Sequence, residues 1–150
     1  MPNEIKIKPI PPTHPGLMPA LALHKLPTAD LATSRGHYFL AELDGQTVGF
    51  GGYESLGRAV LLRSIVVTGD KKTGLGRSIA LATLENARDA GSEMAFLMTE
   101  EAAAFFDRLG FTAITRDETP AAIKAHPQFD RLCPETAVIM KKRLLDTQTL

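Results

Sequence analysis

The chain has 150 residues, 44% hydrophobic and 23% charged, which is typical of one globular domain of ordinary size. Its seventeen basic residues balance seventeen acidic ones, which argues against a nucleic-acid-binding protein, since such proteins usually carry an excess of positive charge. Cys133 has no second cysteine to pair with, and the N-terminus has no leader-like pattern. No apolar run reaches the length of a membrane-spanning helix, about 18 residues. We therefore expect one cytoplasmic domain over residues 1–150.

The N-terminal part predicts short elements separated by prolines. Residues 4–8 alternate between apolar and polar or charged side chains, which indicates a strand that ends at Pro9 and the prolines after it. Apolar residues at helical spacing predict a helix over residues 15–26, which Pro27 ends, and a second short helix over residues 29–34.

A hairpin and a buried strand follow. Asp44-Gly45 stands between the β-prone runs 38–43 and 46–50, and this dipeptide favours a type I′ turn because both central residues need positive φ. After a turn at Gly57, residues 59–67 are almost continuously apolar, which predicts a central strand covered on both faces.

The second half of the chain alternates helices and strands, which indicates an α/β (α+β) domain. We expect, in order, a helix over residues 74–90, a strand over 94–98, a helix between Thr99 and Gly110, a strand over 111–115, an irregular or weakly helical segment over 119–129 and a last strand over 137–140. Glu100 and Glu101 are expected in the first turn of the helix after Thr99, where the positive end of the helix dipole favours acids.

The segment around residue 74, where a loop leads into a helix, has the clearest chemical character. It carries Lys71, Lys72, Gly74, Gly76 and Arg77 where a buried strand leads into a helix. Glycines let backbone N–H groups approach phosphates, and a helix N-terminus offers unpaired donors, so the loop suits a diphosphate. The plainer alternative is an ordinary strand–helix connection. The loop is neither a Walker motif nor a dinucleotide fingerprint, because it lacks the terminal Lys-Ser/Thr and the third glycine.

Two blocks of sequence resemble the GNAT N-acetyltransferase superfamily. Lys71-x-x-Gly74-x-Gly76 is similar to the (Gln/Arg)-x-x-Gly-x-(Gly/Ala) loop with which these enzymes bind the pyrophosphate of acetyl-coenzyme A, although lysine replaces the usual Gln or Arg. A later block resembles Ala-x-x-(Leu/Phe)-Tyr-x-x-x-Gly-Phe and reads Ala102-x-x-Phe105-Phe106-x-x-Leu109-Gly110-Phe111. The resemblance implies a GNAT-like fold, a mostly antiparallel sheet of six to seven strands with helices on both faces and a splayed central strand pair.

A narrower resemblance concerns the acceptor. Residues 61–67, 120–124 and 132–140 are similar to a GNAT subgroup known as arsenic-resistance-associated N-acetyltransferases, and residues 105–141 more distantly resemble the acetyltransferase domain of N-acetylglutamate synthase. Both imply a small amino-acid-like amine as acceptor, and the first implies a setting of arsenic or xenobiotic resistance. Direct capture of arsenic needs several thiolates, which a chain with one cysteine cannot provide. Because no histidine partner is evident for Cys133, it is interpreted as buried and inert.

The resemblance also implies a site for acetyl-coenzyme A along the central strand, the loop and the helix that follows. Its residues are Ile65, Val66, Val67, Lys71, Lys72, Thr73, Gly74, Leu75, Gly76, Arg77, Ser78 and, from the later block, Phe106. A main-chain N–H near residues 65–67 would stabilise the oxyanion formed when the amine attacks the thioester directly.

Candidates for proton transfer and acceptor binding come from several segments. The base is sought among Glu54, Glu100 and Glu42, each of which is otherwise a solvated surface charge. Because Phe106 stands where most of the superfamily has an acidic tyrosine, Thr99, Tyr53 or water would replace it as proton donor. The candidates for binding a substrate carboxylate are Arg35, Arg63 and Thr136.

Other functions stay open at this point. The acceptor could be a protein lysine or N-terminus, or the chain could be a non-catalytic coenzyme A-binding module. Histidines 14, 24, 37 and 126 lack metal-ligand spacing, so we expect no metal and assign them packing or surface roles. We expect no nucleic-acid or membrane partner, and the sequence leaves open whether the chain is a monomer or a homodimer.

Overall fold

The structure, a computed structural model, describes residues 5–24, 26, 28–29, 31, 36–68, 74–126, 129 and 137–144. Within these residues seven strands form one sheet in the order β1-β2-β3-β4-β5-β7-β6. The strands are β1 (Lys6–Ile10), β2 (His37–Leu43), β3 (Gln46–Leu56), β4 (Ala59–Val67), β5 (Met94–Thr99), β6 (Thr112–Ile114) and β7 (Val138–Arg143). The helices are α1 (Leu17–Leu23), α2 (Leu75–Asp89), α3 (Ala103–Asp107) and α4 (Ala121–Lys124).

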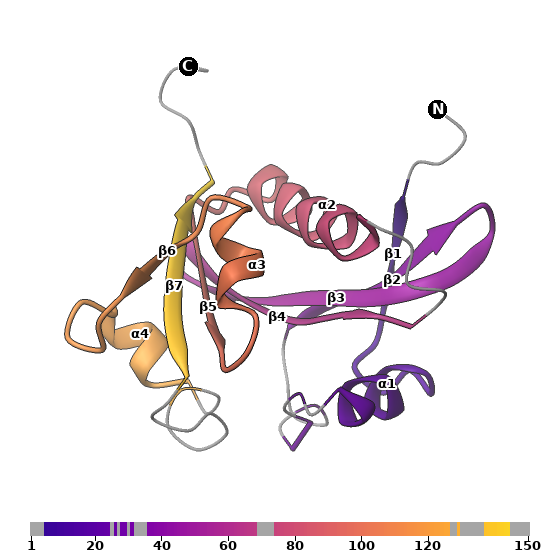
Figure 1. Cartoon of the computed structure of the whole chain (residues 1–150), viewed down its shortest axis with the longest axis horizontal. Helices are drawn as coiled ribbons and strands as arrows, with labels where there is room; N and C mark the ends of the chain where they lie inside the picture. The colour runs from indigo at the N-terminus through magenta and orange to yellow at the C-terminus, as the bar shows by residue number, and fades with distance from the viewer. Residues whose placement is uncertain are drawn as a thin grey trace.

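The sheet is mixed and mostly antiparallel, and its central neighbours β4 and β5 are parallel. Helices α2 and α3 lie on one face of the sheet, and α1 and α4 lie on the other (Figure 1). The predicted fold class is therefore confirmed. In the part of the chain that the structure describes, no helix is long and apolar enough to cross a membrane.

Strand β4 contributes side chains to the hydrophobic core on both faces. Val60 and Leu62 belong to the buried cluster beneath α2, together with Leu84 of that helix. Leu61, between them, belongs to the cluster on the opposite face, with Ile123 of α4. A strand covered on both faces needs apolar side chains at consecutive positions, which explains the nearly continuous apolar run in its sequence.

Glycines of β3 allow α2 to lie unusually close to the sheet. A Cβ added at Gly51 would collide with the Thr83 hydroxyl, and one added at Gly49 would collide with the Val66 carbonyl and with Ile79. Thr83 is fully buried, and its hydroxyl donates to the Ile79 carbonyl of its own helix at 2.8 Å. The position of α2 against the strands therefore depends on the missing side chains of β3.

We expect Gly51→Ala to lower the free energy of unfolding by about 1–3 kcal/mol, because the added methyl group overpacks the contact with α2. Adding Thr83→Ala should recover part of the loss, since it removes the colliding hydroxyl. Urea unfolding of the three proteins measures both effects. Gly76→Ala is the matched control, because the nearest atom to its new Cβ lies 3.5 Å away. A Gly51→Ala variant as stable as the wild type would contradict the close approach.

The predicted hairpin is confirmed, with Asp44 at φ 52° and Gly45 at φ 80°. The first strand begins and ends two residues later than predicted and contains Pro9, paired with Phe39. Proline is tolerated there because β1 is an edge strand, where one side of the backbone needs no partner. Most of the helix expected over residues 29–34 lies outside the described residues.

The expected helix start after Thr99 is wrong. Helix α3 begins at Ala103, so Glu100 and Glu101 are exposed residues of the connection before it, and the first turn contains no acid. The Thr99 hydroxyl accepts a hydrogen bond from the Ala102 amide at 3.0 Å and holds this connection in a turn. This hydrogen bond occupies the Ala102 amide within the connection, and α3 begins at the next residue.

Candidate active site

Strands β4 and β5 diverge soon after their pairing begins. Their register contains Ala59 with Met94, Val60 with Ala95 and Leu61 with Phe96. Beyond these pairs β4 stays with β3 as far as Val67, and β5 stays with β7 as far as Thr99. The facing backbone edges of the two strands are therefore no longer partners of one another, which confirms the predicted splay.

A bulge in β4 lies within the diverging part. The pairing with β3 steps from Phe50–Val66 to Gly52–Arg63, so that β4 has one residue more than its partner. Ser64 in this bulge has φ 63°, a left-handed conformation that a serine rarely adopts inside a strand. Bulges and left-handed residues of this kind concentrate at functional sites, because there they redirect the backbone.

The N-terminus of α2 has the form of an anion site. Gly74 precedes the helix in a left-handed conformation, φ 91°, and no side chain of the residues that the structure describes caps the helix. The first amides of a helix have no partner within it, so the N–H groups of Leu75, Gly76 and Arg77 remain available. Among the described residues a Cβ at Gly76 would meet nothing closer than Phe105 at 3.5 Å, so their packing does not require glycine there.

The other residues predicted to bind the cofactor lie on β4, at the start of α2 or outside the described residues. Ile65, Val66 and Val67 are on β4 beyond the point of divergence, while Arg77 and Ser78 are exposed on the first turns of α2. Lys71, Lys72 and Thr73 lie outside the described residues.

On the face of the sheet opposite α2, a carboxylate binds two basic side chains. Glu54 of β3 accepts, through Oε2, hydrogen bonds from Arg63 NH1 at 2.7 Å and from His126 Nε2 at 2.8 Å. The three side chains are 14%, 2% and 5% exposed. Glu54 pairs with Leu61 across β3 and β4, so the cluster lies at the last pair before β4 and β5 diverge. Arg63 also lies over the Tyr38 ring, 5.8 Å from its centroid.

Two opposing effects act on the Glu54 carboxyl. Burial favours the neutral form, whereas the hydrogen bonds and charges of His126 and Arg63 favour the anion. Together these hydrogen bonds and charges outweigh burial, so the pKa of Glu54 lies below its ordinary value. The carboxylate is therefore ionised at neutral pH.

The other proton-transfer candidates lie apart from this cluster. Glu42 forms an ion pair with Lys8 at 2.9 Å between β2 and the edge strand, and Glu100 is exposed beyond β5. The Tyr53 hydroxyl donates to Asn86 Oδ1 at 2.7 Å on the α2 face, and burial raises its pKa. Asn86 is about 15 Å along the helix from Gly76, at 1.5 Å per residue.

Phe106 occupies the core, not an open surface. It is 8% exposed and packs edge-on against Phe105 and Phe111, with ring centroids 5.0 and 5.6 Å away. Its half-buried neighbour Phe105 is the one that contacts the start of α2. The three remaining predicted residues Arg35, Thr136 and Cys133 lie outside the described residues.

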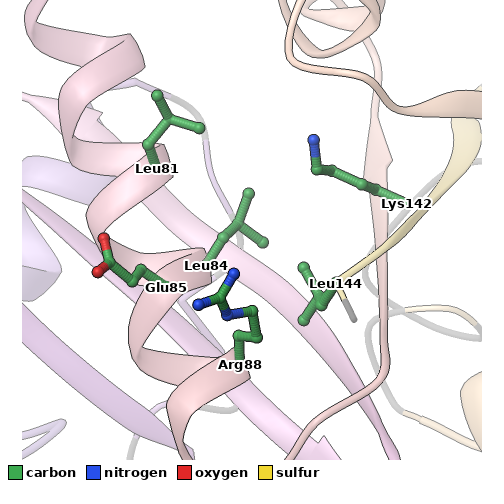
Figure 2. A pocket seen from close by; sticks show the side chains of 6 residues that line it. All are labelled: Leu81, Leu84, Glu85, Arg88, Lys142 and Leu144. Carbon is green, nitrogen blue, oxygen red and sulfur yellow. The ribbon is translucent and has the colours of Figure 1, made fainter. Parts of the chain in front are cut away.

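A surface cavity of about 440 Å³ lies elsewhere, between the later turns of α2 and the end of β7 (Figure 2). Leu84 and Leu144 form its apolar part, and Arg88 and Lys142 extend beside it. The Lys142 ammonium group donates to the Leu109 carbonyl at 2.6 Å. This cavity is separate from both the diverging strands and the N-terminus of α2.

Among the described residues no group of three or more His, Cys, Asp or Glu side chains is placed to hold a metal ion.

Sequence reasoning assigned His126 to packing or the surface and did not predict its hydrogen bond with Glu54. The residue follows α4, in a segment without a clear periodic pattern, 72 residues after Glu54. The one available signal was Arg63, a charge inside an apolar strand, which requires a buried partner of opposite charge. That signal predicts a carboxylate but does not identify the histidine beside it.

Comparisons with known proteins agree with this geometry. The sequence model of the acetyltransferase (GNAT) family matches residues 8–111, and no protein of curated function matches significantly. Among solved structures, N-acetylglutamate synthase from Neisseria gonorrhoeae, complexed with coenzyme A and N-acetyl-glutamate, has a TM-score of 0.74 at 16% identity, covering 95% of this chain and 35% of that chain. Rv2747 from Mycobacterium tuberculosis, in complex with CoA, has a TM-score of 0.73 at 22% identity, covering 93% and 99%. A Bacillus subtilis acetyltransferase in complex with CoA has a TM-score of 0.69 at 17% identity, covering 95% and 100%.

Proposed function

The chain belongs to the acetyltransferase (GNAT) family, and on this premise we propose that it transfers the acetyl group of acetyl-coenzyme A to the amine of a small amino-acid-like acceptor. The observation that carries the proposal is the divergence of β4 and β5 beside the uncapped N-terminus of α2. Related folds crystallised with coenzyme A support it.

The donor is proposed to bind along the diverging strands. The diphosphate of acetyl-coenzyme A accepts hydrogen bonds from the amides of Leu75, Gly76 and Arg77. Its pantetheine arm forms hydrogen bonds with the backbone edge of β4 that faces away from β3. Lys71 and Lys72 supply positive charge beside it. The bulge at Ser64 turns the backbone of β4, so that an amide of residues 65–67 stabilises the oxyanion.

The reaction needs no tyrosine at position 106. The amine attacks the thioester carbon, the C–N bond forms, and the C–S bond breaks with its electron pair on sulfur. A thiol pKa near 8.5 lies about 1.5 units above neutral, so leaving as thiolate costs roughly 2 kcal/mol at 1.36 kcal/mol per unit. Water or Thr99 can supply the proton afterwards.

The acceptor is proposed to carry a carboxylate. The likeness to N-acetylglutamate synthase supports an amino acid, and Arg35, Thr136 and Arg63 are the candidate partners. Arg63 NH1 donates to Glu54, and the planar guanidinium of an arginine matches a carboxylate through two parallel hydrogen bonds. A role in arsenic or xenobiotic resistance would follow if the preferred amine belongs to a toxic compound.

Thiol release from acetyl-coenzyme A tests the proposal with a panel of free amino acids, glutamate analogues, their decarboxylated amines, an organoarsenical amine and a lysine peptide. We expect one free amino acid to exceed its decarboxylated amine by at least about tenfold in kcat/KM, since a buried charge pair is worth more than 1.4 kcal/mol. Equal turnover of the two would contradict carboxylate recognition. Binding of coenzyme A without thiol release would indicate a non-catalytic module, and selective turnover of the peptide would indicate a protein substrate.

A further inference from the structure

The ring of Phe105, on α3, reaches the first turn of α2. A Cβ added at Gly76 would lie 3.5 Å from Cζ and 3.6 Å from Cε1 of Phe105, which belong to the far end of the ring. The same Cβ would lie 3.7 Å from Cγ2 of Val67, the last residue of β4. Three elements therefore bring Phe105, Val67 and Gly76 together on the α2 face of the sheet, beyond the point where β4 and β5 diverge.

The apolar side chains at this meeting point are incompletely covered. Phe105 and Val67 are half-buried, and so is Ile65, two residues before Val67 in β4. Ile65 also faces α2, because a Cβ added at Gly51 would lie 3.2 Å from its Cδ1. An apolar side chain that the protein covers only in part is stabilised when a ligand removes the remainder from water. A strip of apolar surface therefore lies beside the amides proposed to bind the diphosphate.

The neighbouring ring, Phe106, has a different environment. It is 8% exposed, belongs to the main core cluster and packs edge-on against Phe111. Adjacent residues of a helix do not face the same way, so α3 cannot present both rings to one ligand. The structure leaves Phe105 as the ring of this pair with surface to offer.

The chemistry of coenzyme A matches an apolar strip next to a diphosphate site. In its pantetheine arm, the diphosphate is followed by a methylene group and then by a carbon that carries two methyl groups. The rest of the arm is linear and consists largely of amides, with the thiol at its end. When the amides of residues 75–77 bind the diphosphate, the dimethyl group lies within reach of the side chains that surround Gly76. An aromatic ring and a valine are suitable contacts for such a group.

We propose that Phe105 binds the dimethyl group of the pantetheine arm, and that Phe105 instead of Phe106 is the donor-binding ring of residues 102–111. This inference rests on the proposed function, which places the diphosphate at the start of α2. The contact recognises the arm and not the nucleotide, so it distinguishes coenzyme A from other diphosphates. It also fixes the arm close to its diphosphate end, which helps to hold the thioester beside the amides of residues 65–67.

Nuclear Overhauser contacts between unlabelled coenzyme A and protein labelled with carbon-13 in its phenylalanine rings test the contact directly. We expect both methyl resonances of the arm to show contacts to the ring protons of Phe105. Those ring signals are identified by their disappearance in Phe105→Leu. Contacts from the methyl groups to Phe106 instead, or a bound coenzyme A without contacts to Phe105, would overturn the proposal, whatever the activity of the protein.

Affinities test the energetic weight of the contact. We expect Phe105→Ala to weaken the binding of coenzyme A about tenfold, because the dimethyl group loses its apolar partner. Phe105→Leu keeps an apolar side chain and should weaken binding by only about threefold or less. The affinity for ADP, which has the diphosphate without the arm, should stay within about twofold in both variants. Ile114→Ala is the matched control, because Ile114 is equally half-buried but lies on the edge strand β6, and it should keep the wild-type affinity.

The outcomes separate this inference from the proposed function. A wild-type protein that binds coenzyme A no better than a folded Phe105→Ala variant overturns the inference alone. An equal loss of affinity for coenzyme A and ADP also overturns it, because the ring would then only support the start of α2. If Phe105→Ala does not fold, the contacts seen in the wild type and the affinity of Phe105→Leu decide instead. A wild type that does not bind coenzyme A removes the proposed function, and this inference with it.

Discussion

Gly76→Glu is expected to weaken the binding of acetyl-coenzyme A by about 100-fold or more. Two unit charges 4 Å apart interact by about 4 kcal/mol at the effective dielectric constant of a protein surface, and each 1.4 kcal/mol is tenfold in affinity. The new carboxylate would stand among the amides proposed to bind the diphosphate, where it repels the phosphates and occupies their space. Calorimetric titration of coenzyme A into wild type and variant measures the loss.

The controls for Gly76→Glu separate charge, bulk and folding. An acid in the first turn of a helix interacts favourably with the helix dipole and stabilises the folded protein. A loss of binding in Gly76→Glu would therefore not be explained by unfolding. Gly76→Ala adds only a methyl group, which has no neighbour closer than 3.5 Å among the described residues, and it should keep the stability and weaken binding less. Leu81→Glu adds the same charge at an exposed position of α2, and its affinity should equal that of the wild type. Wild-type affinity in a folded Gly76→Glu protein would exclude this helix start as the diphosphate site.

The sheet was predictable from sequence because local signals agreed with tertiary packing. The Asp44-Gly45 turn and the apolar run of residues 59–67 indicate the same hairpin and central strand that the structure contains. The helix after Thr99 was placed too early for the opposite reason. A dipole argument for Glu100 and Glu101 assumes that the helix starts directly after Thr99, whereas residues 100–102 form a connection in which the Thr99 hydroxyl binds the Ala102 amide.

The candidate site could be predicted only where its residues lie close together in the sequence. The loop and the start of α2 form one continuous segment, so a pattern of glycines and basic residues could indicate it. The cluster at Glu54 joins β3, β4 and the end of α4, and its members are brought together by sheet register and by the packing of Ile123. No spacing in the sequence encodes that arrangement. The sequence could therefore name Glu54 and Arg63 as separate candidates, but could not show that they bind each other and His126.

The buried pair of Glu54 and Arg63 is expected to contribute strongly to stability as well. Glu54→Ala leaves the Arg63 side chain, which is 2% exposed, without its carboxylate, and breaking such a pair costs about 3–5 kcal/mol. For a chain of this length that corresponds to a fall of about 6–20 °C in Tm. Glu118→Ala is the control, since Glu118 is an exposed carboxylate whose pKa is lowered by hydrogen bonds to Thr115, and its loss should be much smaller.

The pH dependence of this effect follows from the sign of the Glu54 shift. The pKa of Glu54 is lower in the folded protein than its ordinary value of 4.5, so the folded state favours the anion. The stability that the anion contributes is present above pH 4.5 and is lost as the pH falls through the lower, folded pKa. The difference in unfolding free energy between wild type and Glu54→Ala should therefore be largest near pH 7 and narrow below pH 4. Urea unfolding at both pH values, repeated with Arg63→Met and with the double variant, measures the coupling. A constant difference at all pH values, or single losses that simply add, would mean that Glu54 contributes by packing and not by its charge.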